Sequence, residues 1–144
     1  MINAIIKYYN LSLPEKSLFL ETIYISIKVR FFIKFYSMKT YAKHLGQENT
    51  LVENVELDNV MTLKKYVQSV KRVSRHSFWR TKCFEEAFAL KLLLQNHGQK
   101  STIYFGVAKD EGASLNAHAW LKIGDEMLIG GNGHKKYTVT KFFT

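Results

Sequence analysis

The chain has 144 residues, which is the size of one ordinary domain and enough to bury a core without disulfides or metals. Its 47% apolar and 23% charged residues exclude extended disorder and a fibrous class, and its single cysteine excludes an intramolecular disulfide and two-cysteine zinc motifs. A net charge of +9 predicts acidic partners without choosing among peptide, protein, lipid and nucleic acid. No signal peptide is apparent, and charges interrupt the apolar segment between Leu18 and Met38, so we expect a cytoplasmic protein.

The first predicted helix begins after Ser12, which stands in capping-box spacing with Glu15, and it has Pro14 in its first turn. We expect this helix to run to about Met38, with apolar residues so dense that more than one face must be covered. Its basic edge consists of Lys28, Arg30 and Lys34. The pattern fits a core helix with a solvated rim, or a surface that docks on a partner or a membrane.

Two more helices are predicted after a polar segment, residues 46–59, which indicates a linker. The second helix covers about residues 60–75, where apolar residues recur at helical spacing. For the third helix, Thr81 is the expected N-cap and Gly98 the expected stop. Basic residues on the second helix fit either a solvated face or an electrostatic docking face; they are Lys64, Lys65, Lys71, Arg72 and Arg75.

After Gly98 the apolar period changes from helical to alternating, which predicts strands at residues 101–107, 117–123, 126–130 and 137–143. Gly124-Asp125 suits a two-residue hairpin turn. The predicted fold class is therefore α+β, with N-terminal helices followed by a central helix packed on an antiparallel sheet.

Cys83 is the first candidate for chemistry. It falls in the first turn of the third helix, where unpaired N–H groups and the helix dipole favour a thiolate and could bind an oxyanion. Lys82 and Arg80 act in the same direction, whereas Glu85 and Glu86 oppose it. The alternative is a cysteine that only packs beneath Trp79.

His118 is the second candidate, near the start of a strand and flanked by two alanines. Alone, it fits either a hydrogen-bonded structural residue or a general base. A helix-start cysteine followed by a strand-borne histidine is the layout of papain-like and transglutaminase-like thiol enzymes, in which the imidazole accepts the thiol proton and later protonates the leaving amine.

Three segments, residues 83–98, 103–107 and 117–120, resemble the catalytic core of the leader peptidases of lasso-peptide biosynthesis, which are transglutaminase-like cysteine proteases. The helix near Ser12 and the aromatic Trp79 before the cysteine are similar too, so the resemblance covers about residues 10–143. It implies one peptidase domain over residues 1–144, with a helical part at about 12–76 and a catalytic core with a transglutaminase/papain-like fold at about 77–144.

The resemblance also implies a function and partners. The peptidase would remove the leader from a ribosomally made lasso precursor, so that an ATP-dependent cyclase can form the macrolactam ring. In the family, a small separate module recognises the leader, and we expect a partner protein to carry it here. No cofactor is expected.

The third catalytic residue departs from the family pattern, which has an aspartate about twelve residues after the histidine, where this chain has Gly130. Asn132 is the candidate to orient His118, provided that Gly130-Gly131 forms a bulge, because a regular hairpin would place Gly131 opposite His118. Asp110 is the rival, and a backbone carbonyl or water is the remaining alternative.

Other readings carry less support. The remaining histidines, His44, His76, His97 and His134, have no ligand partners at metal spacing, so we assign no metal site. The aromatics fall at core spacing and no nucleic-acid module is recognised, so nucleic-acid binding is not expected. Rival functions are another acyl transfer on the same scaffold and a non-catalytic scaffold protein of the same maturation complex.

Overall fold

The computed structural model describes residues 8–50, 60–77, 82–109 and 114–144. Their elements are α2 (Leu13–Phe35), α3 (Met38–Tyr41), η1 (Ala42–His44), α4 (Val60–His76), α5 (Cys83–Asn96), β1 (Thr102–Lys109), β2 (Leu115–Ile123), β3 (Glu126–Ile129), η2 (His134–Lys136) and β4 (Thr138–Phe143). The four strands form one antiparallel sheet in the order β3-β2-β1-β4. This arrangement confirms the predicted α+β class and a core consistent with the transglutaminase-like type.

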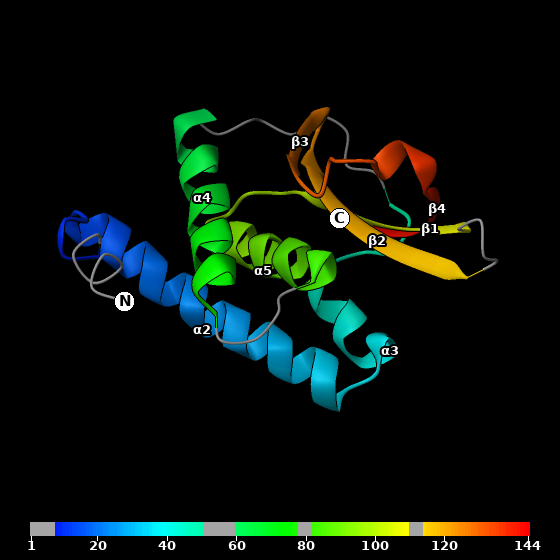
Figure 1. Cartoon of the computed structure of the whole chain (residues 1–144), viewed down its shortest axis with the longest axis horizontal. Coiled ribbons are helices and arrows are strands. Elements are labelled where there is room, and N and C mark those ends of the chain that lie inside the picture. Colours follow the sequence, from blue (N-terminus) through cyan, green and yellow to red (C-terminus); the bar gives the residue numbers. More distant parts are fainter. Residues whose placement is uncertain (1–7, 51–59, 78–81, 110–113) are drawn as a thin grey trace.

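Helix α5 is the centre of the fold, because it packs on β1 and β2 on one side and on α2 and α4 on the other (Figure 1). Its buried residues join those of the other helices and of the sheet in one core. The buried residues of α5, among them Ala87, Leu90, Leu93 and Leu94, are apolar except for Glu85 and Lys91.

Lys91 is the more deeply buried of these two residues, since only 1% of it is exposed. Its Nζ donates a hydrogen bond to the carbonyl of Ser101, and burial lowers the pKa of Lys91 to about 8. The sequence pattern gave no sign of this, since lysine is almost never fully buried.

Helix α2 begins as predicted. The backbone N–H of Ser12 donates to the carboxylate of Glu15 at 3.0 Å, and the Ser12 hydroxyl donates to the same oxygen at 2.7 Å. The helix ends at Phe35 rather than near Met38, because Tyr36 and Ser37 have extended backbones and Ser37 opens the short helix α3.

The segment after α3 does more than link helices. Gln47 and Thr144 exchange backbone hydrogen bonds of 2.8 and 3.0 Å, and Glu48 forms a β-bridge with Phe143. Residues 46–50 therefore lie along the outer edge of β4, while residues 51–59 of the predicted linker lie outside the described residues.

Helix α4 and the hairpin agree with the sequence. Leu63, Tyr66, Val70 and Val73 of α4 are buried, and its basic residues are exposed. Ile123 pairs with Glu126 across the Gly124-Asp125 turn, as predicted. Within the described ranges, none of the helices is long and apolar enough to cross a membrane.

Candidate active site

Cys83 is the first residue of α5, and Lys82 is the N-cap with an extended backbone (φ −95°, ψ 158°). An N-cap at Thr81, as predicted, would make Lys82 the first residue of the helix, so the helix begins one residue later than predicted. Thr81 itself lies outside the described residues. Cys83 is half-buried and carries a free thiol. Its sulfur thus lies at the positive end of the helix, beside N–H groups that have no partner within the helix.

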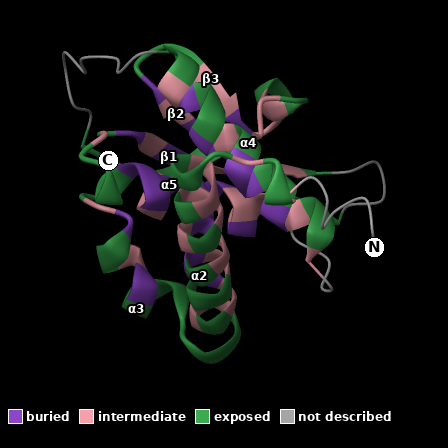
Figure 2. Ribbon diagram, turned by 90° about the vertical axis from the view of Figure 1, so that its left-hand side faces the viewer, coloured by how far each residue is buried: buried purple, intermediate pink, exposed green. Residues whose placement is uncertain are grey.

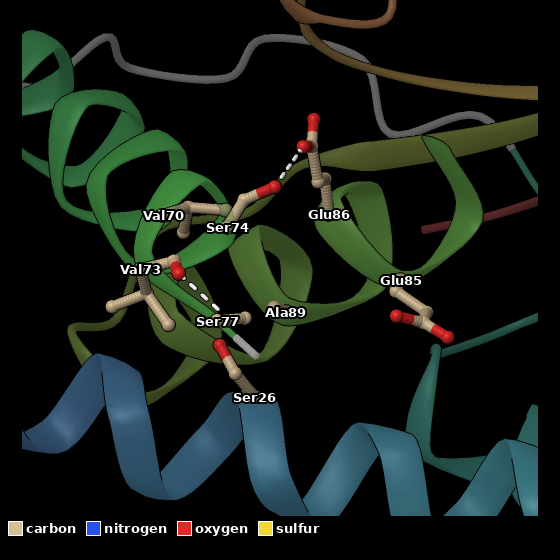
Figure 3. A pocket seen from close by; sticks show the side chains of 8 residues that line it. All are labelled: Ser26, Val70, Val73, Ser74, Ser77, Glu85, Glu86 and Ala89. Carbon is tan, nitrogen blue, oxygen red and sulfur yellow. Dashed lines mark hydrogen bonds between the residues drawn. The ribbon is translucent and has the colours of Figure 1, made fainter. Parts of the chain in front are cut away.

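Two carboxylates in the first turn of α5 are each held by a different helix. Glu85 is 5% exposed and forms an ion pair with Arg30 of α2, while Ser74 of α4 donates a hydrogen bond to Glu86. Figure 3 shows Glu86 pointing to Ser74 and Glu85 pointing away from this pair. Because Glu85 is paired with Arg30, its negative charge repels a Cys83 thiolate less than an unpaired carboxylate would.

A small cavity of about 10 Å³, about the size of one water molecule, lies between α2, α4 and α5 beside these carboxylates. Both Glu85 and Glu86 line it. The Oε2 atom of Glu85 is buried and finds no hydrogen-bond partner among the described residues. The cavity is far too small for a substrate, so it belongs to the support of the helix start.

His118 is half-buried on β2, and its ring is fixed by one hydrogen bond and two ring contacts. Its Nε2 lies 2.7 Å from the carbonyl oxygen of Gly130. The ring centroid is 4.9 Å from that of Tyr137 and 5.9 Å from that of Trp120. Since a carbonyl oxygen only accepts, Nε2 must carry the proton, which leaves Nδ1 as the basic nitrogen of the neutral ring.

The start of α5 lies over the strand pair that carries His118. The ring of Phe84, next to Cys83, is 5.2 Å from that of Phe105 on β1, and Phe105 pairs with Ala119. Along β2, however, side chains alternate, so His118 shares a face with Trp120 while the core-facing Ala119 lies on the other face. The structure thus brings the two elements together but gives no hydrogen bond between the described residues Cys83 and His118.

A bulge is present in β3, but it lies two residues before the expected position at Gly130-Gly131. Lys122 pairs with Met127 and Leu121 pairs with Ile129, so the extra residue is Leu128 rather than Gly130 or Gly131. Gly130 then takes a left-handed backbone (φ +76°), and it is its carbonyl that reaches His118. For the group that orients His118, the sequence left Asn132, Asp110 and a backbone carbonyl or water open, and the Gly130 carbonyl corresponds to the last of these.

Asn132 is exposed, and within the described ranges its side chain makes no hydrogen bond to His118. Asp110 lies outside the described residues. The roles of both remain predictions.

Because the Gly130 carbonyl already holds the ring, we expect Asn132→Ala to keep its activity to within about tenfold of the wild type. Asp110→Ala, measured in the same assay, is the comparison. A loss of activity of about tenfold or more in only one variant would identify that residue as the one that orients His118. It would contradict the expectation that the Gly130 carbonyl is sufficient to hold the ring.

Sequence reasoning missed His134. Its Nδ1 lies 2.6 Å from the carbonyl oxygen of Gly131, and its ring centroid is 5.6 Å from that of Trp120. Two successive glycine carbonyls therefore each accept a hydrogen bond from a histidine. Among the described residues, no group of three His, Cys, Asp or Glu side chains could hold a metal ion.

The family comparison covers both candidate residues. The model of the transglutaminase-like superfamily matches residues 28–141, well over half of the chain, and this range contains Cys83 and His118. Comparison with curated proteins and with solved structures gave no match. The matched range includes about the last third of α2, all of α4 and α5, and the sheet except for the last two residues of β4, and the chain belongs to the transglutaminase-like superfamily.

Proposed function

We propose that the chain is a cysteine peptidase that cleaves an amide bond through a thioester on Cys83. The observation that carries the proposal is that the chain holds two groups prepared for this chemistry on elements that pack together: a thiol at the first position of α5, and a His118 ring on β2 whose Nε2 is engaged so that Nδ1 is basic. Membership of the transglutaminase-like superfamily fits peptidase or acyl-transfer chemistry of this kind.

The proposed reaction has two halves. Nδ1 of His118 accepts the thiol proton as Sγ of Cys83 attacks the scissile carbonyl, and the N–H groups at the start of α5 stabilise the oxyanion. The amine leaves with the proton from His118, and water then hydrolyses the thioester with the same imidazole as base. For this step Sγ of Cys83 and Nδ1 of His118 must come within hydrogen-bond reach, so the proposal requires His118 to leave the face of β2 that it shares with Trp120 when substrate binds.

For the substrate, we propose the leader region of a lasso precursor peptide, cleaved in the cytoplasm before an ATP-dependent cyclase closes the macrolactam ring. Support comes from the residues that resemble the leader peptidases, which include Cys83, His118 and their neighbours. A net charge of +9 and the exposed basic residues of α4 favour acidic partners. A separate leader-recognition protein is proposed to deliver the precursor.

We expect the isolated chain to cleave the precursor slowly, and the leader-recognition partner to accelerate cleavage by about tenfold or more, because tethering raises the local substrate concentration. Mass spectrometry of the products over time measures both rates. A leaderless fragment serves as the control, since the partner cannot tether it. Equal rates with and without the partner, or equal cleavage of the leaderless fragment, would contradict the proposal.

A second candidate is acyl transfer to an amine, because the same thioester can be resolved by an amine in place of water. The product mass separates the two outcomes. A non-catalytic scaffold is the third candidate, favoured by the backbone carbonyl that stands where the family has an aspartate. Failure of a thiol-reactive peptide probe to label Cys83 would support the scaffold.

A further inference from the structure

Helix α2 is apolar on two opposite sides. On the inner side Thr22, Ile25 and Val29 are buried against the rest of the molecule. The outer side carries six large apolar residues at spacings of three, four and seven, which place them on one line along the helix. These residues are Leu13, Leu20, Tyr24, Ile27, Phe31 and Phe35, and together they are called the outer stripe.

The outer stripe is open to solvent, since each of its residues is between 49% and 81% exposed. In Figure 1, α4 and α5 lie on one side of α2 only, and in Figure 2 exposed residues run along the near side of this helix. Tyr36 and Met38, also exposed, extend the apolar surface beyond the helix end. A continuous apolar surface of this kind marks an interaction site, whereas scattered exposed apolar residues need no explanation.

The charges beside the outer stripe are positive. Lys28 flanks it on one side, and Lys16 and Lys34 flank it on the other, as the helical period requires. The Nζ atoms of Lys28 and Lys34 lie over the rings of Phe32 and Phe35, 5.6 and 5.5 Å from the ring centroids. These lysines thus lay their stems along apolar surface with the ammonium groups at its border.

The acidic residues of α2 do not face the stripe as free charges. The Glu15 carboxylate accepts hydrogen bonds from Ser12, and Glu21 binds Asn96 and His97 at the far end of α5. Apart from the exposed hydroxyl of Ser17, the outer face of α2 therefore combines apolar and basic groups.

We propose that the outer stripe binds the surface of an anionic lipid bilayer, with α2 lying in the plane of the interface. The helix is about 35 Å long at 1.5 Å per residue, and its stripe is a convex ridge, which a bilayer accommodates without a matching groove. Phenylalanines and tyrosines bordered by lysines are the composition of helices that insert their apolar face below the headgroups.

The charges argue against a second copy of the chain as the occupant. Pairing two stripes would bring two rows of lysines together, and like charges at such a contact repel. A helix of a partner protein would need acidic residues on both borders of its own apolar face, and the test below includes this outcome.

The test is co-sedimentation of the full chain with vesicles. We expect binding to vesicles that contain phosphatidylglycerol, weaker binding in high salt, and little binding to vesicles of phosphatidylcholine alone. Ile27→Glu and Phe31→Glu should each weaken binding by about tenfold or more, since a carboxylate would enter the interface. The double variant Lys28→Glu, Lys34→Glu should lose the preference for anionic lipid.

Val139→Glu is the matched control, because Val139 is 45% exposed on β4, away from the stripe, and this variant should bind as the wild type does. Circular dichroism melting checks that the variants fold, and Tyr24→Ser is a milder change should a glutamate variant unfold. Cys83→Ser should bind vesicles normally, so the result is independent of the proposed peptidase.

Three results would overturn the proposal. The first is no sedimentation with anionic vesicles, and the second is equal sedimentation of the wild type and the stripe variants. The third is a chain that ignores vesicles but self-associates, or binds an acidic helical peptide, through Ile27 and Phe31.

Discussion

Replacement of Cys83 by serine is expected to lower the rate of amide-bond cleavage by about 10³-fold or more, because a hydroxyl is much less acidic than a thiol and a poorer nucleophile. His118→Ala should cause a loss of similar size, since no base then accepts the thiol proton. The rates are measured by product mass with the precursor and its leader-binding partner present. Wild-type-like cleavage by either variant would end the peptidase assignment.

Controls for this prediction follow from the surroundings of the two residues. Cys83→Ser should leave the melting temperature unchanged, because Cys83 is half-buried and the two side chains differ by one atom. His118→Ala also removes the contacts with Tyr137 and Gly130, so His118→Gln is the better variant. A glutamine amide can still donate to the Gly130 carbonyl but cannot act as a base.

Gly130→Ala is expected to lower the free energy of unfolding by about 3 kcal/mol, from left-handed backbone strain and overpacking together. The φ angle of +76° suits glycine, and a Cβ at this position would lie 2.4 Å from the carbonyl oxygen of Ala119 and 2.9 Å from Cα of Trp120. Both are backbone atoms, so β2 itself would have to move. Because the Gly130 carbonyl holds His118, catalysis should fall along with stability.

Gly124→Ala provides the matched control. Gly124 also has a positive φ, +53°, but a Cβ there would meet nothing within 4 Å. Only the backbone strain remains, so we expect a loss of about 1 kcal/mol and unchanged catalysis. Urea unfolding curves for both variants measure the difference. Equal destabilisation would show that the close approach of Gly130 to β2 has no energetic consequence.

Much of the fold follows from local signals. Ser12, Glu15 and Pro14 marked the start of α2, and Gly98 marked the end of α5, because caps and breakers act within a few residues. The change of apolar period after Gly98 predicted the strands, and Gly124-Asp125 fixed the hairpin. These features depend on neighbours in sequence, so the sequence alone reveals them.

The site was predictable only in part, because its remaining features depend on distant partners. The pairing of Arg30 with Glu85 joins residues 55 positions apart, and spacing does not encode it. The bulge at Leu128 has no glycine to mark it, so the expected position at Gly130-Gly131 was wrong. The carbonyl that holds His118 is a backbone group, which every residue possesses and no sequence motif identifies.

The pairing of residues 47–49 with the end of β4 affects the order in which this chain can fold. β4 is an edge strand of the sheet, and without this pairing its end at Phe142 and Phe143 would also present free backbone groups, which are a template for aggregation. The residues that pair with this end come from the first half of the chain. The ion pair between Lys141 and Glu48, for example, joins residues that are 93 positions apart. Contacts of such high sequence separation form late, because loop closure must precede them. The end of β4 therefore stays open to intermolecular pairing until residues 47–49 have docked on it.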